Sequence, residues 1–142
     1  MKFNINNEKG FSLIEILIAV TVFAIGILAV GKMQMTAINA NFFASGITEA
    51  TTLAQDKMEG LICLSYADPL LDDTNGNGHA GIDSANATTA DHNVIDGRYS
   101  IFWNIAPDHY IDNTKEIRII VTWSDKEAGK KVSITSMKAD II

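Results

Sequence analysis

One acidic side chain stands inside a strongly apolar stretch near the N-terminus. Residues 11 to 30 contain a single charged group, the carboxylate of Glu15. A charge inside a membrane-spanning helix costs about 3 kcal/mol or more, so such residues usually have a partner. Lys9 and Gly10 come directly before the stretch, and a glycine has no Cβ to obstruct a peptidase that needs an extended backbone. The pattern therefore predicts a charge partner for Glu15, unless this residue lies at the membrane interface and reaches water. Cleavage at Gly10, which precedes the stretch, would leave the apolar helix on the mature protein.

A second group of residues has the spacing of a calcium loop. Asp73, Asn75 and Asn77, with Gly78 next, match the start of the D-x-[DN]-x-[DN]-G pattern, in which alternate oxygen donors surround a hard cation. Such a loop needs a glutamate at its twelfth position, where this chain has Ser84, although Asp83 precedes it. Calcium binding by Asp73, Asn75, Asn77 and Asp83 is one prediction. A turn rich in Asn, Gly and Asp, with no ion, is the alternative.

The remaining residues that could support catalysis or bind transition metals do not form a recognisable motif. His79, His92 and His109 fall on predicted loops without the paired spacing of a zinc site, which is the less favoured alternative for them. The chain has no G-x-S-x-G pattern, no phosphate-binding P-loop and no Cys–His pair. We therefore expect a protein that is not an enzyme and has no certain cofactor, with calcium as the candidate ion.

The composition of the chain limits which partners it can bind and how its fold can be stabilised. The 142 residues have a formal net charge of −6, and the Lys and Arg residues are scattered, so nucleic acid is not an expected partner. Cys63 is the only cysteine, so no disulfide can form within the chain and packing alone must hold the fold.

The first half of the chain has the pattern of one long helix, predicted over residues 11 to 64. Its apolar part has about the 20 residues that a helix needs to cross a bilayer. Beyond Lys32 the pattern becomes amphipathic, and the apolar positions recur at three- and four-residue spacing. The residues predicted to form this buried face are Ile47, Ala50, Leu53, Ala54, Met58, Leu61 and Ile62.

The second half predicts a loop followed by a small antiparallel sheet. Residues 65 to 95 have loop composition, whereas residues 97 to 142 contain three alternating apolar stretches with a turn before the last, where Gly129 offers a positive φ. Trp103 and Trp123 take core-facing positions. The predicted fold class is α+β: the long helix, with a transmembrane half and an amphipathic half, packs on a C-terminal sheet of three or four strands.

The N-terminal segment resembles a known class of signal. Lys9-Gly10, then Phe11-Ser12-Leu13-Ile14-Glu15 and an unbroken apolar stretch, are similar to the processing site of type IV prepilins and type II secretion pseudopilins. The resemblance implies cleavage by prepilin peptidase between Gly10 and Phe11, followed by N-methylation of the new terminus. It also implies that Glu15 pairs with the amine of Phe11 on a neighbouring subunit, so that a misplaced subunit would leave two charges unpaired.

The same resemblance implies a domain organisation and a location. Residues 1–10 would be the leader, 11–31 the transmembrane helix that later forms the filament core, and 32–142 the periplasmic or extracellular globular domain. The protein would span the inner membrane once before assembly and then enter a pilus at the cell surface. Its partners would be other pilins and minor pilins, prepilin peptidase and the inner-membrane assembly platform.

Two further stretches indicate which type of pilin the chain resembles. LAQDKMEGL, beginning at Leu53, and the C-terminal EIRIIVTWSDKEAGKKVSITSMKA are similar to minor pilins of the PilV type. The lone cysteine also fits a minor pilin better than a major pilin with a C-terminal disulfide loop. We therefore expect a minor pilin that supports pilus assembly or adhesion. The I-type pseudopilin of type II secretion shares the helix and the first stretch and is the alternative. A single-pass anchored binding domain, unprocessed at Gly10, is the second alternative.

Overall fold

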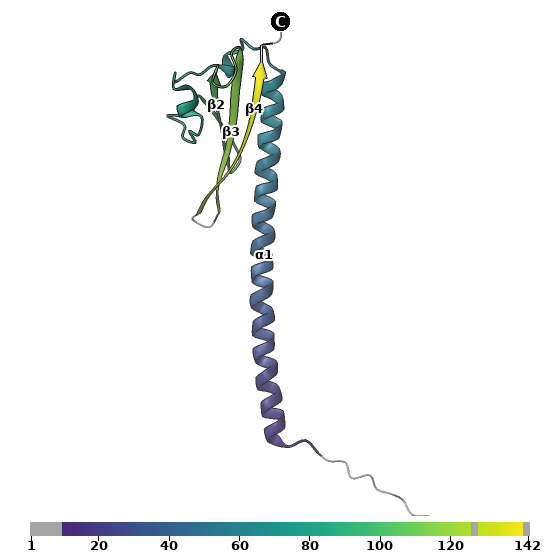
Figure 1. Ribbon diagram of the computed structural model, residues 1–142. Coiled ribbons are helices and arrows are strands. Elements are labelled where there is room, and N and C mark those ends of the chain that lie inside the picture. Colours follow the sequence, from purple (N-terminus) through teal and green to yellow (C-terminus); the bar gives the residue numbers. More distant parts are fainter. Residues whose placement is uncertain (1–9, 126–127, 141–142) are drawn as a thin grey trace, which may run out of the picture. The chain divides into compact units, whose positions relative to one another are not determined.

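A computed structural model describes residues 10–125 and 128–140. Across these residues one long helix, α1 (Leu13–Cys63), precedes two short 3-10 helices and four strands (Figure 1). The short helices are η1 (Pro69–Leu71) and η2 (Gly78–Gly81), and the strands are β1 (His92–Asp96), β2 (Tyr99–Pro107), β3 (Thr114–Asp125) and β4 (Ala128–Ala139). The predicted α+β class, with a long N-terminal helix and a small antiparallel sheet, is confirmed.

The chain divides into two compact units, Met1–Phe43 and Ala44–Ile142. The first unit contains the N-terminal part of α1, and the second contains its C-terminal part together with the sheet. The predicted boundaries after residues 10 and 31 concern processing and membrane burial rather than compactness, so they stay predictions. Of the predicted leader, residues 1–9 lie outside the described part of the chain.

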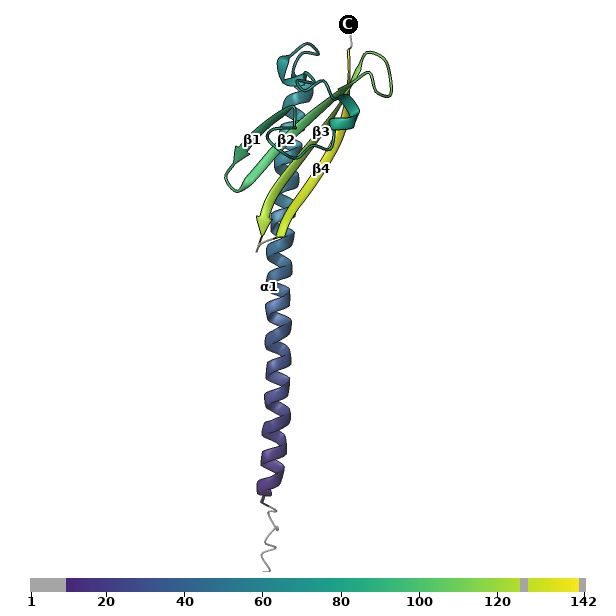
Figure 2. The ribbon, with the colours of Figure 1, turned by 90° about the vertical axis from the view of Figure 1, so that its left-hand side faces the viewer.

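In the second unit, the C-terminal part of α1 packs against one face of the sheet (Figure 2). Alternation places every second residue of a strand on this face, which is why the predicted apolar positions of β2 and β3 are all buried here. The central cluster contains Ala50, Ala54, Met58 and Leu61 of the helix with Tyr99, Ile101, Trp103, Ile105, Ile117, Ile119, Val121 and Trp123 of the strands. The core positions of both tryptophans are confirmed, whereas Ile62, expected on the buried face, is 40% exposed.

The sheet is an antiparallel meander in the order β1-β2-β3-β4. The two-residue turn between β1 and β2 has Gly97 at φ 56°, the conformation that a tight hairpin requires at its first position. Two expectations were wrong here. The predicted loop does not run to residue 95, because β1 begins at His92. Gly129 does not supply a positive φ, because it lies within β4 opposite Ser124.

The segment between α1 and β1 covers part of the other face of the sheet, over β2 and β3, whereas the residues of β4 on that face are exposed. This segment is held by Asp91 and Asn104, which are both buried. The Asp91 carboxylate accepts hydrogen bonds from the backbone N–H groups of Asn75 and Ile105, at 3.2 and 2.8 Å. The Asn104 amide donates to the carbonyl oxygens of Ile82 and Ser84, at 3.0 and 2.9 Å. Because buried polar groups are costly when unpaired, this network fixes the segment on the sheet.

Candidate functional site

The residues of the predicted processing site lie ahead of α1 and are exposed. An added Cβ at Gly10 would meet no atom within 4 Å, and the Phe11 side chain is 80% exposed. Helix α1 begins two residues after Phe11, where the Ser12 carbonyl accepts hydrogen bonds from the N–H groups of Glu15 and Ile16. Gly10 and Phe11 are therefore outside the helix and accessible, as substrate residues of a peptidase must be.

Glu15 lies in the first turn of α1, four residues after Phe11 in the sequence. Both residues line a shallow surface hollow of about 350 Å³, whose other lining residues are Ile16, Ala19 and Val20. The Ser12-x-x-Glu15 spacing is also that of a capping box, in which a glutamate supports the start of a helix. This hollow therefore brings together a carboxylate, the residue predicted to become the N-terminus and apolar side chains.

The apolar surface that follows Glu15 is exposed along the whole first unit. Helix α1 is the one helix in the described part of the chain that is long and apolar enough to cross a membrane, and its most apolar window has a mean hydropathy of 2.8 with none of it buried. Leu17, Phe23 and Leu28 are exposed by 61, 67 and 74%. This surface and the N-terminal position fit a membrane-anchored protein.

The residues of the predicted calcium loop do not all lie in one turn: three lie between η1 and β1 at or close to Asp73, and the fourth contacts a side chain of β3. Asp73 and Asn77 share one turn, in which the Asp73 carboxylate accepts hydrogen bonds from the N–H groups of Asn77 and Gly78, at 3.2 and 2.7 Å. The side-chain amide of Asn75 donates to the Thr89 carbonyl oxygen at 3.1 Å. These contacts resemble those of an ordinary Asx-type turn, so calcium binding here stays a prediction.

Asp83, the fourth residue of the predicted calcium set, faces β3. Its carboxylate accepts a hydrogen bond of 2.6 Å from Nη1 of Arg118, which lowers the pKa of Asp83 below its ordinary value. A second nitrogen of the same guanidinium, Nη2, lies 3.3 Å from Oε1 of Glu116. Arg118 thus links a surface carboxylate to one that is only 3% exposed.

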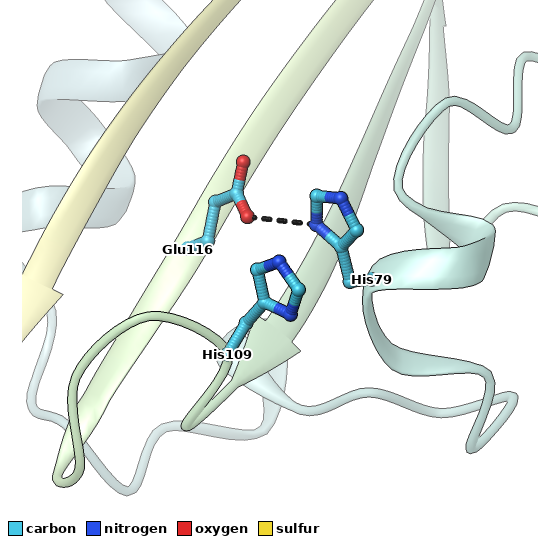
Figure 3. Close-up of side chains that lie close together, drawn as sticks. All are labelled: His79, His109 and Glu116. Atoms are coloured by element: carbon cyan, nitrogen blue, oxygen red, sulfur yellow. Dashed lines mark hydrogen bonds and ion pairs between the residues drawn. The ribbon is translucent and has the colours of Figure 1, made fainter.

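The structure also brings two of the histidines considered for zinc together with a glutamate that the sequence did not indicate. His79 on η2, His109 on the loop after β2 and Glu116 on β3 place one ligand atom each within 4.8 Å of one another (Figure 3). Nδ1 of His79 lies 3.1 Å from Oε2 of Glu116, and the rings of His79 and His109 are stacked with centroids 3.6 Å apart. No short motif connects these residues, because the fold alone brings three distant segments together.

The loops that carry the two histidines have local structural reasons for their shapes. A Cβ at Gly81 would collide with the Asn77 side chain, so a glycine allows η2 to form there. In the loop after β2, Asp108 and Asn113 both have positive φ, and the Asp108 carboxylate accepts a hydrogen bond of 2.7 Å from the Asn113 N–H. His109 follows Asp108 directly and is exposed.

The third histidine and the cysteine lie elsewhere. His92 opens β1, stacks on Trp103 with centroids 5.1 Å apart, and its Nε2 donates to the Asp72 carbonyl oxygen at 3.1 Å. Cys63, the last residue of α1, is a free thiol and is exposed. The prediction that the histidines lie on loops was therefore wrong for His92, in β1, and for His79, in η2.

Comparison with protein families identifies the N-terminal segment. Residues 5–31 match the family described as the prokaryotic N-terminal methylation motif. No curated protein and no solved structure matches the chain. The matched residues include Gly10, Phe11, Glu15 and the apolar part of α1 whose exposure is described above. The match and the fold together support a type IV pilin-like or pseudopilin precursor that prepilin peptidase processes, in a family that is structural rather than catalytic.

Proposed function

We propose that this protein is a minor pilin that is cleaved between Gly10 and Phe11 and then incorporated into a type IV pilus, where it supports assembly or adhesion. The observation that carries the proposal is the length of the exposed apolar surface on α1. Residues 11 to 30 already give the roughly 30 Å that a bilayer requires. Beyond Lys32, however, Met33, Met35 and Ile38 are exposed by 75, 68 and 66%.

A role as a membrane anchor alone does not explain why these three side chains are apolar and exposed. They follow the charged Lys32, so they fall past the end of the predicted membrane-spanning segment. Contiguous apolar surface exposed to water is a mark of an interface. In a filament, the helices of neighbouring subunits would cover both this surface and the membrane-spanning part. The single-pass anchored domain is for this reason the weaker alternative.

Glu15 gives the filament a means of setting its register. In the proposed assembly, the Glu15 carboxylate pairs with the amine of Phe11 on a neighbouring subunit, in a surround that excludes water. A subunit in another register would leave a carboxylate and an amine buried without partners, which costs about 3 kcal/mol or more. Before assembly, the same unpaired carboxylate in the membrane favours extraction of the subunit into the filament.

The minor-pilin role and the I-type pseudopilin role differ in the machine that uses the subunit. The experiment is to follow the protein in sheared surface fractions of two deletion strains, one without the pilus assembly platform and one without the type II secretion platform. The proposal expects loss from the surface fraction in the first strain only. Loss in the second strain only would assign the protein to a pseudopilus. If the protein stays in the membrane and is unchanged in both strains, the result would favour the alternative of a single-pass anchored domain.

A further inference from the structure

We propose that His79, His109 and Glu116 form a binding site for a divalent transition-metal ion such as Zn²⁺. Their ligand atoms lie within 4.8 Å of one another, and they come from η2, the loop after β2 and β3 (Figure 3). All three residues belong to the second unit, Ala44–Ile142. The site is separate from the N-terminal segment and does not depend on the role proposed for it.

The set of donors selects the class of ion. Two imidazole nitrogens and one carboxylate oxygen suit zinc and neighbouring transition metals, whereas calcium and magnesium prefer oxygen ligands alone. Three protein ligands also leave a coordination position for water or for a group from another molecule. This site is thus chemically distinct from the oxygen-rich turn that contains Asp73 and Asn77.

The carboxylate of the site is held in place before any ion arrives. Glu116 is 3% exposed and lies on β3 between Ala106 of β2 and Met137 of β4. Its Oε1 lies 3.3 Å from Nη2 of Arg118, which leaves Oε2 directed at His79. A ligand whose orientation is fixed by its neighbours loses less freedom on binding, as is usual at metal sites.

The Glu116 carboxylate supplies the negative charge at the site. Glu116 and Asp83 carry two negative charges when ionised, and Arg118, which pairs with both, carries one positive charge. Lys131 also acts on the Asp83 carboxylate, so the negative charge that faces the imidazoles is that of Glu116, which also pairs with Arg118. A buried carboxylate that is only partly compensated is stabilised by a further positive partner, and a metal ion supplies one.

One ring has to turn for all three ligands to reach the same ion. The imidazoles of His79 and His109 are parallel within 3°, so their ring nitrogens do not point at a common centre. The side chain of His79 is 38% exposed and already contacts Glu116. His109 is exposed on its loop, and rotation of this side chain completes the site. We therefore expect His109 to contribute the ligand that responds to metal.

The competing explanation is a plain ion pair between His79 and Glu116 with His109 stacked on it. Titration calorimetry with Zn²⁺ on the full chain in detergent micelles, stripped with a chelator, distinguishes the two. The parent protein should carry Cys63→Ser, because the exposed thiol is itself a zinc ligand. His92→Ala is the matched control, because His92 is the one histidine of the chain outside the group.

Saturable binding of one Zn²⁺ per chain is expected for the parent and for His92→Ala. His109→Ala, which removes an exposed side chain, should weaken that binding by roughly tenfold or more and abolish the zinc-dependent rise in Tm. Glu116→Gln should do the same, and if that variant does not fold, His109→Ala still decides the question. Equal zinc binding by His109→Ala and His92→Ala, or a parent that does not saturate, would overturn the proposal.

Discussion

The hydroxyl of Tyr99 donates a hydrogen bond of 2.6 Å to Oε2 of Glu49, and so joins β2 to α1 within the second unit. Nη2 of Arg98 lies 3.1 Å from the same oxygen. The hydrogen bond from Tyr99, and next the contact with Arg98, lower the pKa of Glu49 below its ordinary value of 4.5. Burial, together with the hydrogen bond to Glu49, raises the pKa of Tyr99. The ionised form of Glu49 is therefore the form that the folded protein favours.

This contact predicts a stability difference that depends on pH. Because the pKa of Glu49 is lowered on folding, its contribution is present above pH 4.5 and is lost as the pH falls through the folded-state pKa. Glu49→Gln should lower Tm at pH 7, and the gap to the parent should shrink at pH 3. Thermal unfolding of the full chain in detergent measures both values.

The control for that comparison is Glu59→Gln, which changes an exposed glutamate of the same helix. Glu59→Gln should follow the parent at both pH values. A Glu49→Gln variant with an equal deficit at pH 7 and pH 3 would show that the carboxylate charge has no part in the contact.

The calcium hypothesis can be tested at Asp73. If the loop binds calcium, Asp73→Ala should lower Tm more in the presence of calcium than with chelator, since ligand binding to the folded state adds stability. Asp112→Ala, at an exposed aspartate in the loop after β2, is the control. An equal loss of Tm in both conditions would assign Asp73 only to the turn, where it accepts hydrogen bonds from Asn77 and Gly78.

The sequence was a good guide wherever one face of an element is buried. In β2 and β3 the alternation of apolar residues indicated the helix-facing side correctly, from Tyr99 to Ile105 and from Ile117 to Trp123. Four-residue spacing in α1 likewise indicated Ala50 and Ala54. Burial imposes these periods on the sequence, so the periods can be read from it.

Strand β1 could not be predicted in the same way. Its burial pattern has one half-buried residue followed by four exposed ones, so it has no apolar face that would produce alternation. The strand forms because its backbone pairs with β2, from His92 opposite Trp103 to Asp96 opposite Tyr99. Backbone hydrogen bonding is independent of side-chain type, and it leaves little trace in a sequence.

The histidine–glutamate group was missed for a reason of topology. His79, His109 and Glu116 become neighbours because Asp91 and Asn104 fix one segment over the sheet and the loop after β2 bends at Asp108. The processing site, in contrast, is a continuous motif, and the family match covers Gly10, Phe11 and Glu15. Motifs that are contiguous in sequence can be recognised before the fold is known, and sites that the fold assembles cannot.

The register role of Glu15 predicts a defect in assembly without a defect in processing. Glu15→Ala should reach the membrane and lose its leader, yet enter filaments about tenfold less than the parent, because the neighbouring amine is left unpaired. Thr21→Ala, which changes another polar residue of the apolar helix, should be incorporated normally. Quantitative immunoblots of purified filaments against membranes measure this. Normal incorporation of Glu15→Ala would refute the charge pairing.

The most direct test of the central claim is the intact mass and N-terminal sequence of the protein from a sheared surface fraction and from membranes. A Gly10→Val variant, expected to keep its full length, is the control for the cleavage position. We predict loss of residues 1–10 and a methylated Phe11 at the terminus of the surface form. An uncleaved chain confined to the membrane, in a strain whose prepilin peptidase is active, would contradict the claim.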